Sequence, residues 1–340
     1  MKHTKRLRVG HMGTLHDHSS GKLECVLKFP ELFEVVGVAE DDPERRAQLR
    51  QLPPYRDLPI LTKQQLLDAG CDCMLIEGFE YDLPCDAMLC IQNGIPVHID
   101  KPGGRDLAMF TSMLAEAKKR QLPVQMAYMY RYNPAVADCL SKVRAGRLGE
   151  IYSVSAIMNT GHDAQKRRWL QQFEGGIMFF LGCHMVDLIY QLQGYPDAVT
   201  PFLRSSGFDG VTAADQATAI FTYRNGLSIA QANACEVNGF GRRQLVVCGS
   251  EGTYEIHPLE RPIRAAYTHA SFAETFYDRH QELSFRTVPP EERYDAMILD
   301  FAAMVRGEKE NPFSYETELH VQQLVLAACG CSAAVPEKNL

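Results

Sequence analysis

The first third of the chain alternates short apolar runs with amphipathic segments of helical periodicity. This alternation is typical of βαβ units, whose strands lie parallel in one sheet because each helix crosses back over it. The runs expected to be strands are Leu7–Met12, Phe33–Glu40, Leu58–Leu61, Cys73–Ile76, Ile95–Ile99 and Val124–Met129. The helices expected among them include Lys63–Ala69, Cys85–Asn93 and Asp106–Arg120. The pattern predicts an α/β domain on a parallel sheet.

From about Glu150 the pattern changes to strict apolar/polar alternation, separated by turn signals such as Asn225-Gly226. The expected strands are Tyr152–Met158, Ala217–Tyr223, Leu227–Ala232, Gln244–Cys248 and Thr253–Ile256. We predict an α+β domain with an open, largely antiparallel sheet. The expected division is residues 1–125 and 126–340, with the helical stretch Glu316–Cys329 returning to the first domain.

Composition narrows the possible functions. The 340 residues are 46% hydrophobic and 23% charged, which is typical of a globular enzyme of two domains. The net charge of −7 comes without a basic block, so nucleic acid is not an expected partner. No run of about 20 apolar residues suggests a membrane span, and no apolar signal-peptide core follows the basic N-terminus. The 11 cysteines form no CxxC pair, so we expect free thiols in the cytoplasm.

The turn after the first expected strand is a candidate dinucleotide site. Such a turn uses glycines for a tight bend, for close approach to a pyrophosphate and for helix–strand packing. Aligned on Gly13, the other two glycine positions hold Leu15 and His18. Glu40 ends the second strand, where an acid binds the ribose hydroxyls of NAD and disfavours the 2′-phosphate of NADP. We therefore predict a Rossmann-type domain that binds NAD, with NADP as the second candidate. The expected cofactor-binding residues are Gly13, Thr14, Leu15, His16, Glu40, Glu77 and Lys101.

Further motifs follow in a characteristic order. Gly94–Pro102 places a glycine, a strand and an Asp-Lys-Pro triplet in succession, and Tyr130–Pro134 reads Tyr-Arg-Tyr-Asn-Pro. Gly146–Ile151 reads Gly-Arg-Leu-Gly-Glu-Ile, and a Gly175-Gly176 turn precedes the segment Gly182–Asp187. With Asn225-Gly226 and Gly249–Thr253, this series resembles the glucose-fructose oxidoreductase/inositol dehydrogenase family, also written Gfo/Idh/MocA, over nearly the whole chain.

The resemblance implies a catalytic site that combines the Lys of the Glu-Lys-Pro triplet with an Asp and a His four residues apart on one helical face. Lys101 and His184 match the Lys and the His, but Phe180 stands at the Asp position and Asp100 replaces the Glu. Asp187 is three residues after His184, so we expect it to orient the imidazole. The predicted catalytic residues are Lys101, His184 and Asp187.

The predicted substrate residues are Tyr130 and Arg131, from the Tyr-Arg-Tyr-Asn-Pro turn, and Trp169, which follows two arginines. His16-Asp17-His18 offers two imidazoles in one loop without a clear third partner, so the sequence predicts no metal site.

By resemblance, the expected function is hydride transfer between NAD(P) and a sugar, cyclitol or related polyol. Two alternatives remain open: an NAD-dependent glycosidase of the same family, and a non-catalytic sugar- or nucleotide-binding regulator. The expected partners are a small-molecule substrate and further copies of the chain, in a homodimer or homotetramer.

Overall fold

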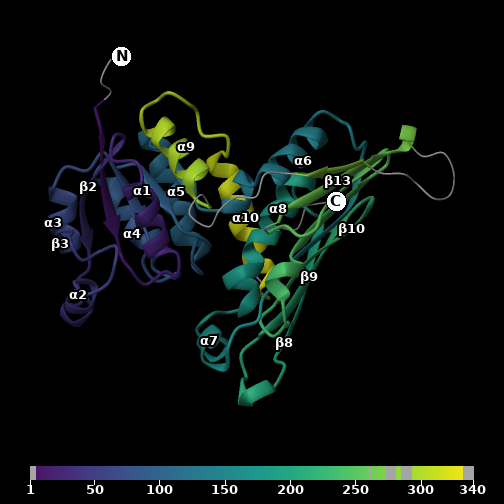
Figure 1. Ribbon diagram of the computed structural model, residues 1–340, viewed down its shortest axis with the longest axis horizontal. Coiled ribbons are helices and arrows are strands. Elements are labelled where there is room, and N and C mark those ends of the chain that lie inside the picture. Colours follow the sequence, from purple (N-terminus) through teal and green to yellow (C-terminus); the bar gives the residue numbers. More distant parts are fainter. Residues whose placement is uncertain (1–4, 261, 273–280, 285–292, 332–340) are drawn as a thin grey trace. The chain divides into compact units, whose positions relative to one another are not determined.

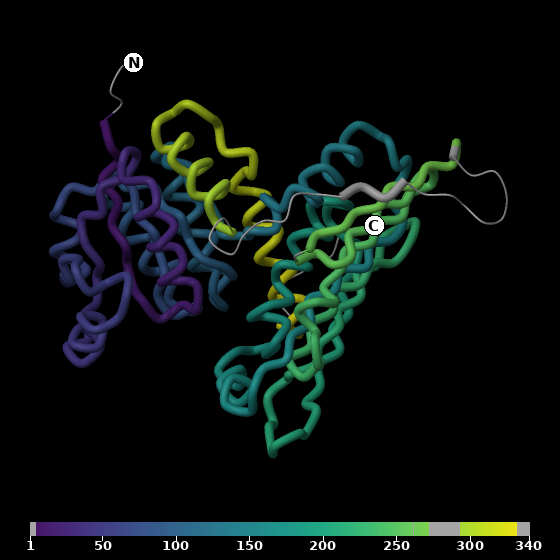
Figure 2. The backbone as a smooth tube through the Cα atoms, viewed as in Figure 1, coloured from purple at the N-terminus to yellow at the C-terminus, as the bar shows by residue number. Residues whose placement is uncertain are grey.

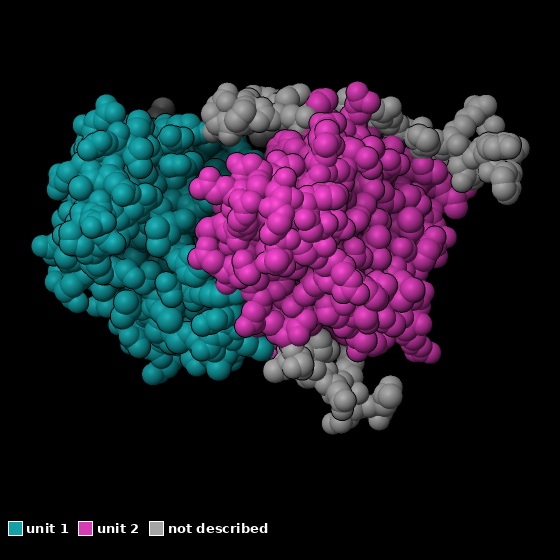
Figure 3. All heavy atoms as spheres, turned by 90° about the horizontal axis from the view of Figure 1, so that it is seen from below, with its two compact units in different colours: residues 1–129, 289–319 teal, residues 130–288, 320–340 magenta. Residues whose placement is uncertain are grey.

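The computed structural model describes residues 5–260, 262–272, 281–284 and 293–331. The chain forms two compact units (Figure 3), each described by itself. Unit 1 comprises residues 1–129 and 289–319, and unit 2 comprises residues 130–288 and 320–340. The segment 289–319 therefore belongs to the first unit, although the sequence-based division assigned it to the second domain.

Unit 1 contains a six-stranded parallel sheet with the strand order β3-β2-β1-β4-β5-β6. This confirms the predicted Rossmann-type domain, and in such a sheet ligands bind outside the carboxyl ends of the strands where the order reverses, here β1 and β4. The strands are β1 (Leu7–Met12), β2 (Phe33–Ala39), β3 (Ile60–Leu61), β4 (Cys73–Ile76), β5 (Val97–Ile99) and β6 (Val124–Met126). The helices are α1 (Ser19–Leu27), α2 (Pro43–Leu49), α3 (Lys63–Asp68), α4 (Leu83–Gln92), α5 (Leu107–Arg120) and α9 (Asp295–Val305).

Local capping explains where several of these helices begin. Thr62 accepts a hydrogen bond from the amide of Gln65, whose side chain returns one to the amide of Thr62, so α3 starts with a capping box. Asp106 caps α5 through the amide of Met109. Helix α9 returns from late in the chain, and its Ile298 and Phe301 join the core formed by β1, β4 and α1.

Unit 2 contains an eight-stranded sheet in the order β14-β13-β12-β11-β7-β10-β9-β8. The pair β7–β10 is parallel and the other pairs are antiparallel, so the predicted open, largely antiparallel sheet is confirmed. The strands are β7 (Ile151–Asn159), β8 (Ala198–Arg204), β9 (Gln216–Tyr223), β10 (Gly226–Asn233), β11 (Gln244–Gly249), β12 (Gly252–Ile256), β13 (Arg264–His269) and β14 (Gln281–Ser284). Helices α6 (Pro134–Arg144) and α8 (Cys183–Gln193) lie on one face of the sheet, as Figures 1 and 2 show.

The Tyr-Arg-Tyr-Asn-Pro motif has a direct structural reason. Asn133 caps α6 by accepting hydrogen bonds from the amides of Ala135 and Val136, and Pro134 takes the first helical position, where no amide donor is needed. The short helix α7 (Ala164–Trp169) and the π-helical turn η3 (Met178–Gly182) precede α8. Helix α10 (Tyr315–Ala328) begins in unit 1 and continues in unit 2. None of the helices in the described ranges combines the length and hydropathy that a bilayer crossing requires.

Candidate functional site

The turn after β1 is tight because it meets the backbone that follows β4. Gly13 has a φ of +82°, and a Cβ at this position would lie 2.5 Å from Gly78 Cα. Only glycine fits there without a shift of backbone. In this chain the glycine therefore serves the contact between two loops of the protein.

The turn also reaches the end of β2. Thr14 Oγ1 donates a hydrogen bond to Glu40 Oε2 at 3.0 Å, and the Arg45 guanidinium donates to the Thr14 carbonyl at 3.1 Å. Leu15 is 56% exposed, unlike its neighbours in the turn. The amides of Thr14 and Leu15 donate to no acceptor within the described residues, so they are available to an outside anion such as a phosphate.

Ionisable side chains gather at the carboxyl ends of β1, β4 and β5. We call this group the strand-end cluster, and all its members are buried except His18, whose side chain is 19% exposed. The members are His16, His18, Lys22, Glu77, Glu80, His98, Asp100 and Lys101. Such a concentration of buried ionisable groups is a candidate functional site on physical grounds.

Asp100 makes most of the contacts within the strand-end cluster. Its carboxylate accepts from Lys22 Nζ at 3.0 Å and from the Lys101 amide at 2.7 Å, and it lies 3.2 Å from His18 Nδ1. His16 Nε2 lies 3.1 Å from the Lys101 carbonyl, which makes this nitrogen the donor. His16 Nδ1 faces Asp100 Oδ2 at 3.5 Å.

These contacts set the protonation states. Burial lowers the pKa of His16 and of His18, so both imidazoles are neutral at neutral pH. Burial and the neighbouring Asp100 raise the pKa of Glu77 well above its usual range. Burial alone would raise the pKa of Asp100, but the Lys22 ammonium and the hydrogen bond with His18 hold it well below its usual range. The cluster thus places an ionised carboxylate beside neutral imidazoles.

Most of the predicted cofactor residues meet in unit 1. Thr14 contacts Glu40, Gly13 abuts the backbone of Glu77 and Gly78, and His16 contacts the Lys101 carbonyl. Lys22, Glu80 and His98 also belong to the cluster but were not predicted from the sequence. Two signals were available: His18 and Lys22 are one helical turn apart, and His98 and Asp100 have the two-residue spacing of one strand face.

His184 lies in unit 2, whereas Lys101 belongs to unit 1. The imidazole of His184 is buried in the first turn of α8 and meets the Tyr130 ring edge to face, with 5.2 Å between centroids. The Tyr130 hydroxyl donates a short hydrogen bond to Glu260 and accepts one from Arg243 Nη1 at 3.1 Å. Arg243 also pairs with Glu260 at 2.9 Å, so Tyr130 is held on two sides.

The structure places Asp187 differently from our expectation. Both its oxygens accept hydrogen bonds from Arg131, the shortest at 2.7 Å from Nη2, and both side chains are buried. The carboxylate that was expected to orient His184 is thus committed to Arg131, and the arginine expected to contact substrate is committed to Asp187. Fork-to-fork pairing of this kind satisfies both ions and favours a structural role.

Aromatic rings surround the position where the family pattern has its acid. Phe180 stacks with Phe173 at 6.1 Å and meets Trp169 edge to face at 5.0 Å between centroids. Lys166 Nζ lies 3.4 Å from the Trp169 ring centroid. The π-turn that carries Phe180 is a type of helix irregularity often found at functional sites. Trp169 is half-buried at the margin of this group.

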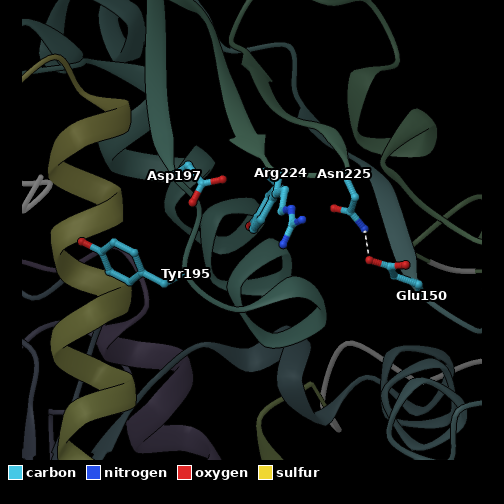
Figure 4. Close-up of a pocket in the computed structure, with 6 residues that line it drawn as sticks. Glu150, Tyr195, Asp197, Arg224 and Asn225 are labelled. Atoms are coloured by element: carbon cyan, nitrogen blue, oxygen red, sulfur yellow. Dashed lines mark hydrogen bonds between the residues drawn. The ribbon is translucent and has the colours of Figure 1, made fainter. Parts of the chain in front are cut away.

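A separate pocket of about 480 Å³ lies in unit 2 (Figure 4). In it the Asn225 amide donates to the Glu150 carboxylate at 2.8 Å, as the dashed line in Figure 4 shows. The pocket is lined by Glu150, Tyr195, Asp197, Tyr223, Arg224 and Asn225. None of the predicted site residues lines it, so it is not the candidate active site.

The family resemblance is confirmed by comparison with known proteins. Residues 138–255, which run from α6 to β12, match the model of the GFO/IDH/MocA C-terminal domain. Over these residues, about a third of the chain, the sequence is similar to the C-terminal domain of Gfo/Idh/MocA proteins. Among solved structures, levoglucosan dehydrogenase in complex with NADH and levoglucosan superposes with a TM-score of 0.81 at 17% identity, covering 97% of this chain and 98% of that chain.

Other relatives are also named as dehydrogenases. Trans-1,2-dihydrobenzene-1,2-diol dehydrogenase of Xenopus laevis is 24% identical over 230 residues, which are 66% of this chain and 67% of that protein. A myo-inositol dehydrogenase of Streptomyces leeuwenhoekii is 24% identical over 131 residues, 38% of this chain and 39% of that protein. UDP-N-acetylglucosamine 3-dehydrogenase of Acidithiobacillus ferrooxidans shares the fold with a TM-score of 0.76 at 18% identity, over 96% of this chain and 98% of that chain.

Proposed function

We propose that this protein is a nicotinamide-dependent oxidoreductase that oxidises a secondary alcohol of a sugar, cyclitol or related diol. The observation that carries the proposal is the sheet of unit 1, where the turn at Gly13 and the acid Glu40 lie at the carboxyl ends of adjacent strands. The relatives named above are dehydrogenases, and they favour this reaction over a glycosidase or a regulator.

The turn fits a dinucleotide in two respects. The amides of Thr14 and Leu15 are free to meet a phosphate, and Glu40 is placed to accept hydrogen bonds from ribose hydroxyls. Glu40 also disfavours a 2′-phosphate by like-charge repulsion, which supports NAD(H) over NADP(H). When bound, the nicotinamide supplies the acceptor for the hydride that leaves the alcohol carbon.

The proton of the substrate hydroxyl needs a separate acceptor. We assign it to His184, because an imidazole suits proton transfer near pH 7 and the Tyr130 ring packs against it. Lys101 is assigned to the substrate oxygen, where an ammonium donor favours developing negative charge. Two electrons leave with the hydride and one proton passes to His184, so the alcohol becomes a ketone.

The test is turnover by the purified protein with NAD⁺ or NADP⁺ across a panel of sugars, cyclitols and trans-dihydrodiols. We expect reduced cofactor to accumulate with at least one secondary alcohol and faster with NAD⁺. Absence of binding of either nicotinamide at millimolar concentration, measured by calorimetry, would contradict the proposal whatever the substrate.

We also propose that the chain assembles through the open face of the unit 2 sheet. Ile220, Ile229, Ser155 and Val246 are half-buried neighbours in register across this face. Three of these four side chains are aliphatic, and a partly apolar sheet face of this kind is a candidate interface. Light scattering should give a dimer or tetramer for the wild type and a smaller species for Ile229→Lys. A monomeric wild type at micromolar concentration would contradict the assembly.

A cytoplasmic location completes the proposal. All 11 cysteines are free thiols, as expected of a protein in a reducing compartment. Fractionation of the source cells would test this assignment.

A further inference from the structure

The turn after β1 and the end of β5 bring three metal-ligating groups together. His16 Nδ1 lies 3.5 Å from Asp100 Oδ2, and His18 Nδ1 lies 3.2 Å from Asp100 Oδ1. All three ligand atoms lie within 4.8 Å of one another. In a tetrahedral site with metal–nitrogen bonds of about 2.0–2.1 Å, ligand atoms are about 3.3 Å apart. The two imidazole–carboxylate distances are close to this value, and a small inward shift of the His16–His18 loop would bring all three groups onto one cation.

The surroundings orient these groups as they do in metal sites. A ligating histidine usually donates its second ring N–H to a carbonyl or carboxylate, which fixes the ring. His16 Nε2 donates to the Lys101 carbonyl at 3.1 Å, and this leaves Nδ1 facing Asp100. Asp100 is itself held by the Lys101 amide at 2.7 Å. The His18 amide, 3.2 Å from His16 Nδ1, must move by a small shift of the turn when a cation binds.

A second, independent observation comes from Glu77. Its carboxylate is completely buried, and no hydrogen bond of good geometry reaches either oxygen within the described residues, although Lys22 forms an ion pair with it. Its Oε1 lies 3.5 Å from Lys22 Nζ, and its Oε2 lies 4.0 Å from His16 Nδ1. Buried carboxylates are normally hydrogen-bonded or coordinated to a metal. Glu77 Oε2 is therefore a fourth ligand within reach.

We propose that His16, His18 and Asp100, with Glu77 as the fourth ligand, bind a divalent cation of the Zn²⁺ type. Two imidazoles and carboxylates favour zinc-like transition metals over magnesium or calcium, which prefer all-oxygen sites. Lys22 Nζ contacts Asp100 Oδ2 and Glu77 Oε1, on the far side of each carboxylate. Asp100 Oδ1 accepts the Lys101 amide with one lone pair, so its second lone pair and Glu77 Oε2 are left for the metal. The partly exposed ring of His18 gives the cation a path from solvent. Bound there, the cation joins the β1 turn to β5.

The test uses Co²⁺ as a spectroscopic probe on the full-length protein after treatment with a chelator. We expect one equivalent to bind, with the ligand-field absorption of a four-coordinate site and without thiolate charge-transfer bands. His18→Asn should weaken binding by about 100-fold or more, because losing a group that merely supports a ligand already costs about 10–100-fold. Zn²⁺ should raise the melting temperature of the wild type but not of this variant.

The matched control is His257→Asn, which removes an exposed histidine of unit 2. It should bind Co²⁺ as the wild type does. Three outcomes overturn the proposal: no saturable binding at millimolar Co²⁺, a thiolate spectrum that assigns the metal to cysteines, or equal affinity in His18→Asn and wild type. If His18→Asn fails to fold, the stoichiometry and spectrum of the wild type still decide. None of these readouts depends on nicotinamide or substrate, so the proposed oxidoreductase activity is tested separately.

Discussion

In unit 1 the buried ionisable groups gather around one carboxylate, whereas in unit 2 the buried arginines form separate ion pairs with carboxylates. Asp100 contacts His18, Lys22 and the Lys101 amide. In unit 2, by contrast, the Asp187 carboxylate forms an ion pair with Arg131. Phe180 stands at the position where the family pattern has an aspartate. Groups that are still able to exchange protons or bind cations are thus concentrated in unit 1. In unit 2 the candidate for proton transfer is His184.

The largest expected effect tests whether His184 alone carries the proton transfer of unit 2. Loss of a positioned general base typically costs on the order of 10²–10⁴ in rate. We expect His184→Gln to lower kcat by that factor on any active substrate, with little change in melting temperature. Lys101→Met should cost a similar factor through the substrate oxygen.

His257→Gln is the control for replacing a histidine elsewhere in unit 2 and should leave turnover unchanged. Equal turnover by His184→Gln and wild type would transfer the proton role to another group, and the strand-end cluster would then become the first candidate.

The next largest effect is expected on stability, and it distinguishes a structural from a catalytic role for Asp187. Arg131→Met leaves the buried Asp187 carboxylate without its guanidinium partner, and breaking a buried pair in this way costs about 3–5 kcal/mol. The double variant Arg131→Met/Asp187→Leu should recover most of that loss, since neither charge then remains buried. Urea denaturation measures both.

A double variant as unstable as the single one would show that the pair is needed beyond charge neutralisation. Retention of wild-type turnover by a stable double variant would establish that Asp187 has no direct part in catalysis.

The sequence predicted the strands, the sheet types and the site position better than it predicted contacts. Alternation revealed most strands, but β8 contains Pro201 and was missed; the structure places it at the edge of the sheet, where proline is tolerated. Helix α9 was missed because its sequence is apolar almost all round and shows no clear periodicity.

For the candidate site, too, the sequence predicted the position but not the contacts between side chains. Parallel strands made it predictable that residues after β1, β4 and β5 would lie at one edge of the sheet. Which side chains touch there depends on the loop conformation and on Lys22, which reaches the cluster from α1. Pairing of Asp187 with Arg131 likewise joins two segments far apart in the sequence, and helical spacing alone indicated His184 instead.

A smaller effect is expected on the pH dependence of the free energy of unfolding, because His11 of unit 1 is buried as a neutral imidazole. Burial lowers the pKa of His11 to about 4, while its value in the unfolded chain is 6.5. Below pH 6.5 the unfolded chain therefore takes up a proton that the folded protein does not, so stability falls as the pH falls and levels off below about pH 4. At roughly pH 5 the loss from this residue is about 2 kcal/mol relative to pH 8.

Urea denaturation at both pH values measures this loss, and His11→Asn should reduce it by that amount. His269→Asn, which removes a partly exposed histidine from unit 2, should not. An equal pH dependence in His11→Asn and wild type would mean that His11 is not held neutral by burial.

The smallest effect tests whether the turn of unit 1 still selects a cofactor. Thr14 holds the Glu40 carboxylate at the end of β2, where it meets ribose hydroxyls and repels a 2′-phosphate, while Arg45 lies beside the same threonine. Removing the carboxylate in Glu40→Ser leaves Arg45 to attract the phosphate, so the ratio of the two dissociation constants should move toward NADP(H) by about tenfold, or about 1.4 kcal/mol. Glu44→Ser makes the same change of charge at an exposed position of α2 and serves as the matched control. Calorimetry with NAD(H) and NADP(H) measures both variants. An equal shift in Glu44→Ser would mean that net charge, rather than the position of Glu40, sets the preference, and tighter binding of NADP(H) by the wild type would reverse the assignment.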